Sequence, residues 1–315
     1  MFNIQEEAFG SLTQLELSNV LTGEYVTIIH DYGTLVNDLV LKSNGKNYSI
    51  LRGTNTDHDI VGKKWFKGAK LSPFPNRIRD GAYSFNRKKY QLPITEEARH
   101  NALHGFIYNK PFELIAHEEG TEHASVEFEY NYGGKIEGYP FPYRISMVYT
   151  LSVDGFECET CIKNTGKDAM PVGDGWHPYF KTGTMVDQLQ LLLPKCKRLL
   201  LDKRMIANGK RTAFNDFDVM SKIGPQEFDT PFELENTGNI LSTELFDAQR
   251  NLKITLWQET GTNKYNYLQI YIPPDRQSIA IEPMTCEPDA FNNGGGLITL
   301  KPNEVIKASY GVSVK

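Results

Sequence analysis

Residues 123–132 read HASVEFEYNY, and apolar and polar side chains alternate along this stretch with a period of two. Val126, Phe128, Tyr130 and Tyr132 share one face, and polar residues occupy the other. A period of two is the geometry of a β-strand with one face buried and one face in water. The stretch therefore predicts a strand of an antiparallel sheet.

The same alternation recurs in at least four other segments. These are YRISMVYTLSV (143–153), FECETCIKN (156–164), NLKITLW (251–257) and YLQIYIPP (267–274). The side chains expected to point inward are Ile145, Met147, Tyr149, Leu151, Val153, Phe156, Cys158, Thr160, Ile162, Leu252, Ile254, Leu256, Leu268, Ile270 and Ile272. Turn signals such as Asn44-Gly45 and Asp154-Gly155 separate such runs.

Helical periodicity is scarce, and only residues 95–104 (TEEARHNALH) suggest one short helical turn. We therefore expect an all-β chain in which large, mostly antiparallel sheets stack face to face. No linker, repeat or low-complexity tract interrupts the sequence, which predicts a single domain over residues 1–315.

The composition argues against two classes of partner. The net charge is −5, which disfavours nucleic acid, and no apolar stretch is long enough to span a bilayer. The first ten residues, MFNIQEEAFG, lack the basic start and apolar run of a signal peptide. We expect a soluble, cytoplasmic protein, either a monomer or a homodimer.

Cys158 and Cys161 form a C-x-x-C pair, a spacing found in redox and zinc sites. Residues three apart on a strand point to opposite faces, so these two thiols cannot share a metal there. His100 and His104 lie four apart, as in helical zinc pairs, but Gly105 follows at once and argues against a long helix. We expect reduced cysteines and no metal.

His177 lies within GDGWHPYFKTG (173–183), where glycines and Pro178 stiffen an aromatic corner. Taken alone, this setting favours a packed histidine over one that moves protons. Glu282 lies in the apolar run IAIEPM (279–284), where partial burial would raise its pKa and suit a general base. The alternative is a glutamate on an edge strand with its carboxylate in water.

Arg77 lies in SPFPNRIRDGAY (72–83), framed by prolines and Asn76. A guanidinium on a stiff loop suits recognition of a hydroxyl-rich or anionic ligand. An ion pair with Asp80 is the structural alternative.

Five segments, in this order and spacing, closely resemble the aldose 1-epimerase (galactose mutarotase) family in its bacterial form. They are PNRIRDGAYSFNRKKYQL (75–92), NALHGFIYNKPFEL (101–114), GYPFPYRISMVYTLSVDGFECETCIKNTG (138–166), GWHPYF (175–180) and IEPMTCEPDAFN (281–292). The likeness extends from about residue 24 to the C-terminus. It implies a β-supersandwich that interconverts sugar anomers without a cofactor.

The resemblance also implies roles for individual residues. Glu282 corresponds to the general base and His177 to the general acid. The residues that correspond to sugar contacts are Asn76, Arg77, His104, Tyr179 and Asp229. Residues 217–220 read FDVM, whereas the family more often has F-D-F-R, and this departure leaves substrate preference open.

Ring opening of a hemiacetal requires one base and one acid acting across the same sugar. We therefore expect an ionised Glu282 beside a protonated His177, acting on a free aldohexose such as glucose or galactose. Trp176, Tyr179 and Phe106 are candidates to stack on the sugar.

Two alternatives stay open at this point. The first is a mutarotase for hexose 6-phosphates or other modified sugars, with Arg79, Lys88 or Arg144 as phosphate contacts. The second is a non-catalytic carbohydrate-binding protein on the same fold. A glycosidase fits less well, because only one strong candidate carboxylate is present.

Overall fold

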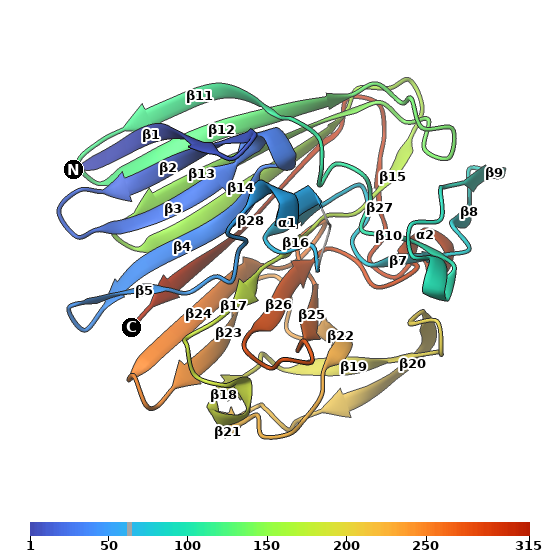
Figure 1. The fold of residues 1–315 in the computed structure, drawn as a ribbon. Coiled ribbons are helices and arrows are strands. Elements are labelled where there is room, and N and C mark those ends of the chain that lie inside the picture. Colours follow the sequence, from blue (N-terminus) through green and yellow to red (C-terminus); the bar gives the residue numbers. More distant parts are fainter. Residues whose placement is uncertain (62–64) are drawn as a thin grey trace.

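The computed structural model describes residues 1–61 and 65–315, and most of its regular elements are strands (Figure 1). The helical elements in this part of the chain are α1 (Asp57–Val61), α2 (Ala290–Asn293) and the short 3₁₀ turns η1 (His30–Tyr32), η2 (Glu97–Arg99) and η3 (Val186–Gln188). The turn η2 lies where the sequence predicted one short helical turn, and this prediction is confirmed.

Most strands of the described residues belong to three antiparallel sheets. The first has the order β1 (Phe2–Phe9), β2 (Leu12–Asn19), β3 (Glu24–Ile29), β4 (Leu35–Ser43), β5 (Lys46–Ser49). The second has the order β11 (Glu113–Glu119), β12 (His123–Tyr132), β13 (Tyr143–Ser152), β14 (Gly155–Asn164), β28 (Val305–Val314), β24 (Leu252–Glu259), β23 (Ile240–Asp247), β18 (Gln190–Leu192), β21 (Ser221–Lys222).

The third sheet carries the residues of most interest. Its order is β20 (Ala207–Phe214), β19 (Cys196–Leu201), β22 (Asp229–Leu234), β25 (Tyr267–Tyr271), β26 (Ile279–Met284), β16 (Gly175–His177), β6 (Ala69–Leu71), and β17 (Tyr179–Phe180) also pairs with β26. Three small ribbons pair β7 (Arg77–Arg79) with β10 (Asn101–Leu103), β8 (Ala82–Phe85) with β9 (Lys88–Gln91), and β15 (Met170–Val172) with β27 (Ile298–Leu300).

The sheets stack around one continuous apolar core. Strand β2 packs against β12 and β13, and β4 packs against β28, so the first sheet covers the second (Figure 1). Leu17 of the first sheet, Phe128 of the second and Ile281 of the third belong to the same buried cluster. The expected all-β architecture of stacked antiparallel sheets is confirmed.

The predicted inward faces are largely confirmed. Every residue named above for the four further segments is buried except Val153, which is 69% exposed in the turn between β13 and β14. In HASVEFEYNY, Tyr130 is only half-buried. The prediction for Val153 is wrong because the strand ends at Ser152 and the alternation stops with it.

The four cysteines are free thiols, and Cys158 and Cys161 lie on opposite faces of β14 as expected. In the part of the chain that the structure describes, no helix is long and apolar enough to cross a membrane. The same residues contain no group of three or more His, Cys, Asp or Glu side chains placed to hold a metal ion.

Candidate active site

Glu282 lies on β26, an interior strand of the third sheet with β25 on one side and β16 and β17 on the other. Its side chain is 1% exposed, and its partner across the strand pair is Gln269. The edge-strand alternative for Glu282 is therefore wrong. A carboxyl group has been placed in the interior of a sheet, where burial is costly unless the group is paired or used.

His177 is the last residue of β16 and reaches the same point from the neighbouring strand. Its Nε2 atom lies 3.4 Å from Oε1 of Glu282, and its ring stacks on Tyr179 at 5.0 Å between ring centroids. His177 is 6% exposed and borders a cavity. An imidazole at this distance from a carboxyl group can exchange a proton with it after a small movement.

Asn76 directly precedes β7 and His104 directly follows β10, and the two residues are hydrogen-bonded to each other. The backbone N–H of Asn76 donates to Nδ1 of His104 at 3.1 Å, and the N–H of His104 donates to the carbonyl of Asn76 at 2.8 Å. Because Nδ1 accepts a hydrogen bond, the neutral His104 ring carries its proton on Nε2. The His104 ring lies 5.4 Å from that of His177.

Gly105 allows this loop to pack closely against the chain before β7. It has a φ of +68°, and a Cβ atom at this position would lie 2.1 Å from the carbonyl oxygen of Ser72. A larger residue would have to displace that backbone, and with it the neighbouring His104. The close packing of the backbone therefore explains why glycine follows His104 in the L-H-G motif.

Arg77 is held by Glu96, whose carboxylate accepts hydrogen bonds from Nε at 2.9 Å and from Nη2 at 3.0 Å. Although burial opposes the shift, these bonds to Arg77 and one from Asn101 lower the pKa of Glu96. Asp80 instead bonds Arg204 and His100. The alternative that paired Arg77 with Asp80 is wrong.

A chain of hydrogen bonds forms one wall of the cavity. The side-chain amide of Asn76 donates to Oε1 of Gln269 at 3.1 Å, and the amide of Gln269 donates to Asp229 at 2.8 Å. Asp229 is the first residue of β22, two strands away from Glu282. The chain links three elements and fixes the orientation of each polar group.

These groups surround a cavity of about 270 Å³. All seven residues that the sequence predicted line it, together with five that it did not: Trp65, Phe66, Arg99, Gln269 and Tyr271. Gln269 and Tyr271 alternate with Leu268 and Ile270 in YLQIYIPP, so the period of two could have placed them on a common face. No pattern in the sequence marks Trp65 and Phe66.

Two of the three expected sugar-stacking aromatics lie elsewhere. Trp176 is fully buried and stacks on Tyr310 inside the core, because it points to the opposite side of β16 from His177. Phe106 packs against Tyr132 and Tyr139. Tyr179 alone of the three lines the cavity, where Trp65 and Phe66 accompany it.

The basic residues suggested as phosphate contacts do not line the cavity either. Arg79 pairs with Asp202, and Arg144 on β13 pairs with Glu129. Lys88 is an exposed residue of β9. His100 and His104 also diverge, since His100 is exposed and bonds Asp80 whereas His104 borders the cavity.

Burial shifts the pKa values of Glu282 and His177 in directions that oppose an ion pair. Burial raises the pKa of Glu282 well above its usual range; Asp229 adds to the rise and Arg77 opposes it. Burial, with a smaller contribution from Arg77, lowers the pKa of His177 to about 3. Both shifts favour the neutral carboxyl group and the neutral imidazole over their charged forms.

These shifts run against the expected ion pair of Glu282 and His177 as long as no ligand stabilises the charges, so the ion pair stays a prediction for the ligand-bound site. Removing two charges from water is costly, and the attraction across 3.4 Å offsets that cost. The pair nevertheless holds one proton, as an ion pair would. Moving that proton from the carboxyl group to the imidazole would change the charges without any exchange with solvent.

Two atoms of the pair have unused hydrogen-bonding capacity. Oε2 of Glu282 and Nδ1 of His177 are buried and have no hydrogen-bond partner within the described residues. Buried polar atoms of folded proteins nearly always have partners, so unpaired atoms beside a cavity point to a ligand. A hydroxyl-rich molecule could satisfy both.

Fold and site together define the class: an antiparallel β-supersandwich with a carboxyl–imidazole pair in a polar cavity suited to proton transfer on a hydroxylated ligand. The protein-family model described as "Aldose 1-epimerase" matches residues 16–313. The chain therefore belongs to the aldose 1-epimerase family.

Relatives of known sequence include an uncharacterized protein of Escherichia coli, YihR, which is 29% identical over 78% of this chain and 79% of its own length. The galactose mutarotase of Bos taurus is 25% identical, over 57% of this chain and 52% of its own length.

Solved structures support the fold. A galactose mutarotase-like protein from Clostridium acetobutylicum superposes with a TM-score of 0.88 at 23% identity, covering 100% of this chain and 98% of the other. A galactose 1-epimerase from Lactobacillus acidophilus gives a TM-score of 0.80 at 18% identity, with 100% and 98% coverage. At these identities the likeness shows the fold alone.

Proposed function

We propose that this protein is an aldose 1-epimerase that interconverts the α and β anomers of a free aldohexose such as glucose or galactose. The observation that carries the proposal is the Glu282–His177 pair, 3.4 Å apart and buried beside a polar cavity. Binding alone would not need a buried acid–base pair. Its presence favours catalysis over the non-catalytic alternative.

The reaction requires two proton transfers and one bond cleavage. Glu282, as the carboxylate, removes the proton from the O1 hydroxyl while protonated His177 donates to the ring oxygen O5. The C1–O5 bond breaks and O1 becomes the aldehyde oxygen. Rotation about C1–C2 and closure with the roles reversed give the other anomer. The pair ends with the one proton it began with.

Substrate binding would have to shift that proton from Glu282 to His177 before the ring opens. A sugar hydroxyl that donates to the unpartnered Oε2 of Glu282 would stabilise the carboxylate, and Arg77 already favours that charge. The ring oxygen would accept from the imidazolium. The sugar would thus supply hydrogen bonds to buried polar atoms that have no partner within the described residues.

The other cavity residues suit a sugar ring. Arg77, His104 and the Asn76–Gln269–Asp229 chain offer both donors and acceptors to hydroxyl groups. Tyr179, Trp65 and Phe66 offer aromatic faces to the apolar C–H side of the ring. Neither set alone distinguishes glucose from galactose.

One observation bears on the alternative of a phosphorylated sugar. Arg99 lines the cavity, but its guanidinium bonds Glu96 at 2.9 Å, and Asp229 adds a further carboxyl group nearby. Arg77, the other arginine of the cavity, also pairs with Glu96, so the charge of both arginines is already compensated. This supports an uncharged aldose over a sugar phosphate.

Anomer relaxation tests this choice directly. Freshly dissolved α-anomers of glucose, galactose and glucose 6-phosphate would each be followed by polarimetry or by NMR of the anomeric proton. We expect acceleration with the free hexoses. Acceleration confined to glucose 6-phosphate would overturn the free-aldose proposal, and none with any of the three sugars would favour a binding protein.

A further inference from the structure

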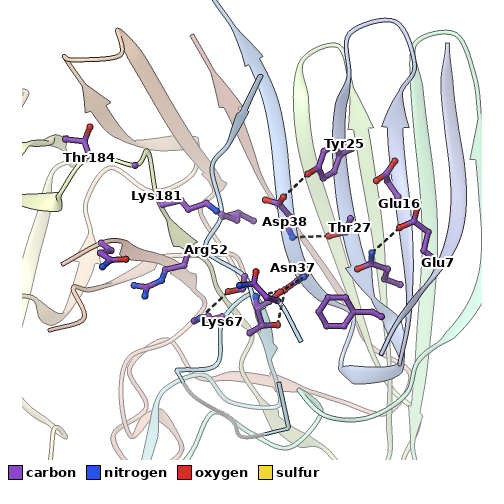
Figure 2. A pocket seen from close by; sticks show the side chains of 18 of the residues that line it. Glu7, Glu16, Tyr25, Thr27, Asn37, Asp38, Arg52, Lys67, Lys181 and Thr184 are labelled. Carbon is purple, nitrogen blue, oxygen red and sulfur yellow. Dashed lines mark hydrogen bonds between the residues drawn. The ribbon is translucent and has the colours of Figure 1, made fainter. Parts of the chain in front are cut away.

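A second, larger cavity of about 890 Å³ is lined by other residues than the catalytic one, and Figure 2 shows its lining. One wall is the outer face of the first sheet, represented by Glu7, Gln14, Glu16 and Thr27. The other consists of residues 51–55, Lys181 and residues 183–185, with Lys67 and Gln277. We call this cavity the cleft. None of the catalytic groups lines it.

The charges of the cleft are balanced. Three carboxylates come from β1, β2 and β4 of the first sheet, and three cations face them. The carboxylates are Glu7, Glu16 and Asp38, and the cations are Arg52, Lys67 and Lys181. A polyanion would meet the carboxylates and a polycation would meet the lysines and arginine. Mixed donors and acceptors of this kind suit a neutral, hydroxyl-rich ligand.

Two groups in the cleft have unused hydrogen-bonding capacity. Oε1 of Gln14 is buried without a hydrogen-bond partner among the described residues, while its amide nitrogen lies 3.3 Å from Glu7. The ammonium group of Lys181 forms no ion pair or hydrogen bond with the described residues. An unused acceptor and an unused donor thus face one space.

The cleft and the catalytic cavity share a wall. Trp65 lines the catalytic cavity and packs against Tyr179, with ring centroids 6.3 Å apart. Arg52 lines the cleft, and its guanidinium carbon lies 5.2 Å from the centre of the Trp65 ring. The N–H of Arg52 donates to the carbonyl of Tyr179 at 2.8 Å. One layer of side chains therefore separates the two spaces.

We propose that the cleft binds the further glycosyl units of a neutral reducing oligosaccharide whose reducing-end sugar occupies the catalytic cavity. The inference rests on the proposed function and extends its substrate class from single hexoses to reducing oligosaccharides. The chain of sugars would cross the Trp65–Arg52 wall. Gln14 and Lys181 would then bond hydroxyl groups of the second or third unit.

The test compares substrates of different length in matched variants. Maltotriose and cellotriose probe the cleft, and glucose probes the catalytic cavity alone. Lys181→Ala removes the unused donor, and Lys222→Ala removes an exposed lysine of β21 as the control. We expect Lys181→Ala to lower kcat/KM about tenfold on at least one trisaccharide, as loss of a hydrogen bond to a charged group does, and to leave glucose unaffected.

Equal effects of Lys181→Ala on glucose and trisaccharides, or no effect on either, would overturn the inference. A parallel measurement separates this outcome from failure of the proposed function. Saturation-transfer NMR reports trisaccharide binding whether or not the sugar is turned over. Binding that Lys181→Ala weakens would support the cleft even in a protein without epimerase activity, and no binding to the unsubstituted protein would rule it out.

Discussion

Glu282 and His177 carry one proton between them, and its position decides what the site can do. Burial favours the proton on the carboxyl group, whereas ring opening needs it on the imidazole. The pair is therefore one ligand-induced proton shift away from its reactive form. Only a ligand that stabilises the carboxylate would produce that shift.

The pH dependence of kcat/KM tests this arrangement, because kcat/KM reports ionisation in the free enzyme. The pKa of His177 is lowered to about 3, so a second proton binds the pair only in strongly acidic solution. The pKa of Glu282 is raised, so the single proton is retained above the ordinary glutamate range. We expect kcat/KM to stay level as the pH falls through about 6.5, the usual histidine value.

An acidic limb with its midpoint near the usual histidine pKa of about 6.5 would contradict this arrangement. Such a result would mean that His177 titrates as an ordinary, hydrated imidazole. The same profile recorded for His100→Asn serves as a control, since His100 is exposed and lies outside the cavity.

At the scale of strands, the period of two predicted which side chains face the core but not which strands are neighbours. The alternation placed Leu268 and Ile270 inward, yet only the structure pairs Gln269 with Glu282 across β25 and β26. Register depends on contacts between segments far apart in the sequence, which one sequence does not reveal. Trp65 and Phe66 were not predicted, because they lie in a turn, where the sequence has no hydrophobic periodicity.

The positions of the residues that carry the resemblance were predicted more accurately. Each of these residues lies in a short motif that the local backbone geometry requires. L-H-G needs glycine at position 105, where a Cβ atom would strike the backbone of Ser72. The positions of the aromatic residues in GWHPYF were harder to predict. Successive residues of a strand, here Trp176 and His177, point to opposite sides. Motifs thus identified the polar groups of the site more reliably than its walls.

A buried Lys70–Asp174 pair ties β6 to the segment that leads into β16, the strand that carries His177. The ammonium of Lys70 donates to Asp174 at 2.6 Å and to Thr160 at 2.7 Å, and Lys70 is fully buried. Lys70→Met would leave Asp174 as an uncompensated buried acid. We expect a loss of about 3–5 kcal/mol in the free energy of unfolding, measured by urea denaturation.

Lys307→Met is the matched control for that measurement. Lys307 also pairs with an acidic residue, Glu159, but in an exposed position on β28, where such pairs contribute at most about 1 kcal/mol. Equal destabilisation by the two substitutions would contradict the role assigned to the buried pair.

For the whole molecule, the continuous core that joins three sheets predicts one cooperative domain over residues 1–315. Calorimetry should then give a single unfolding transition whose calorimetric and van't Hoff enthalpies agree. Two separable transitions would show that the first sheet, or another part, folds independently.

The central claim is that Glu282 and His177 open the sugar ring by proton transfer. The most direct measurement is the enzymatic mutarotation rate of α-glucose and α-galactose, by polarimetry, for Glu282→Gln, His177→Asn and the control His100→Asn. With native circular dichroism in each variant, we predict a loss of at least about a hundredfold for the first two and none for the control. A rate for Glu282→Gln equal to that of the unsubstituted protein would contradict the claim.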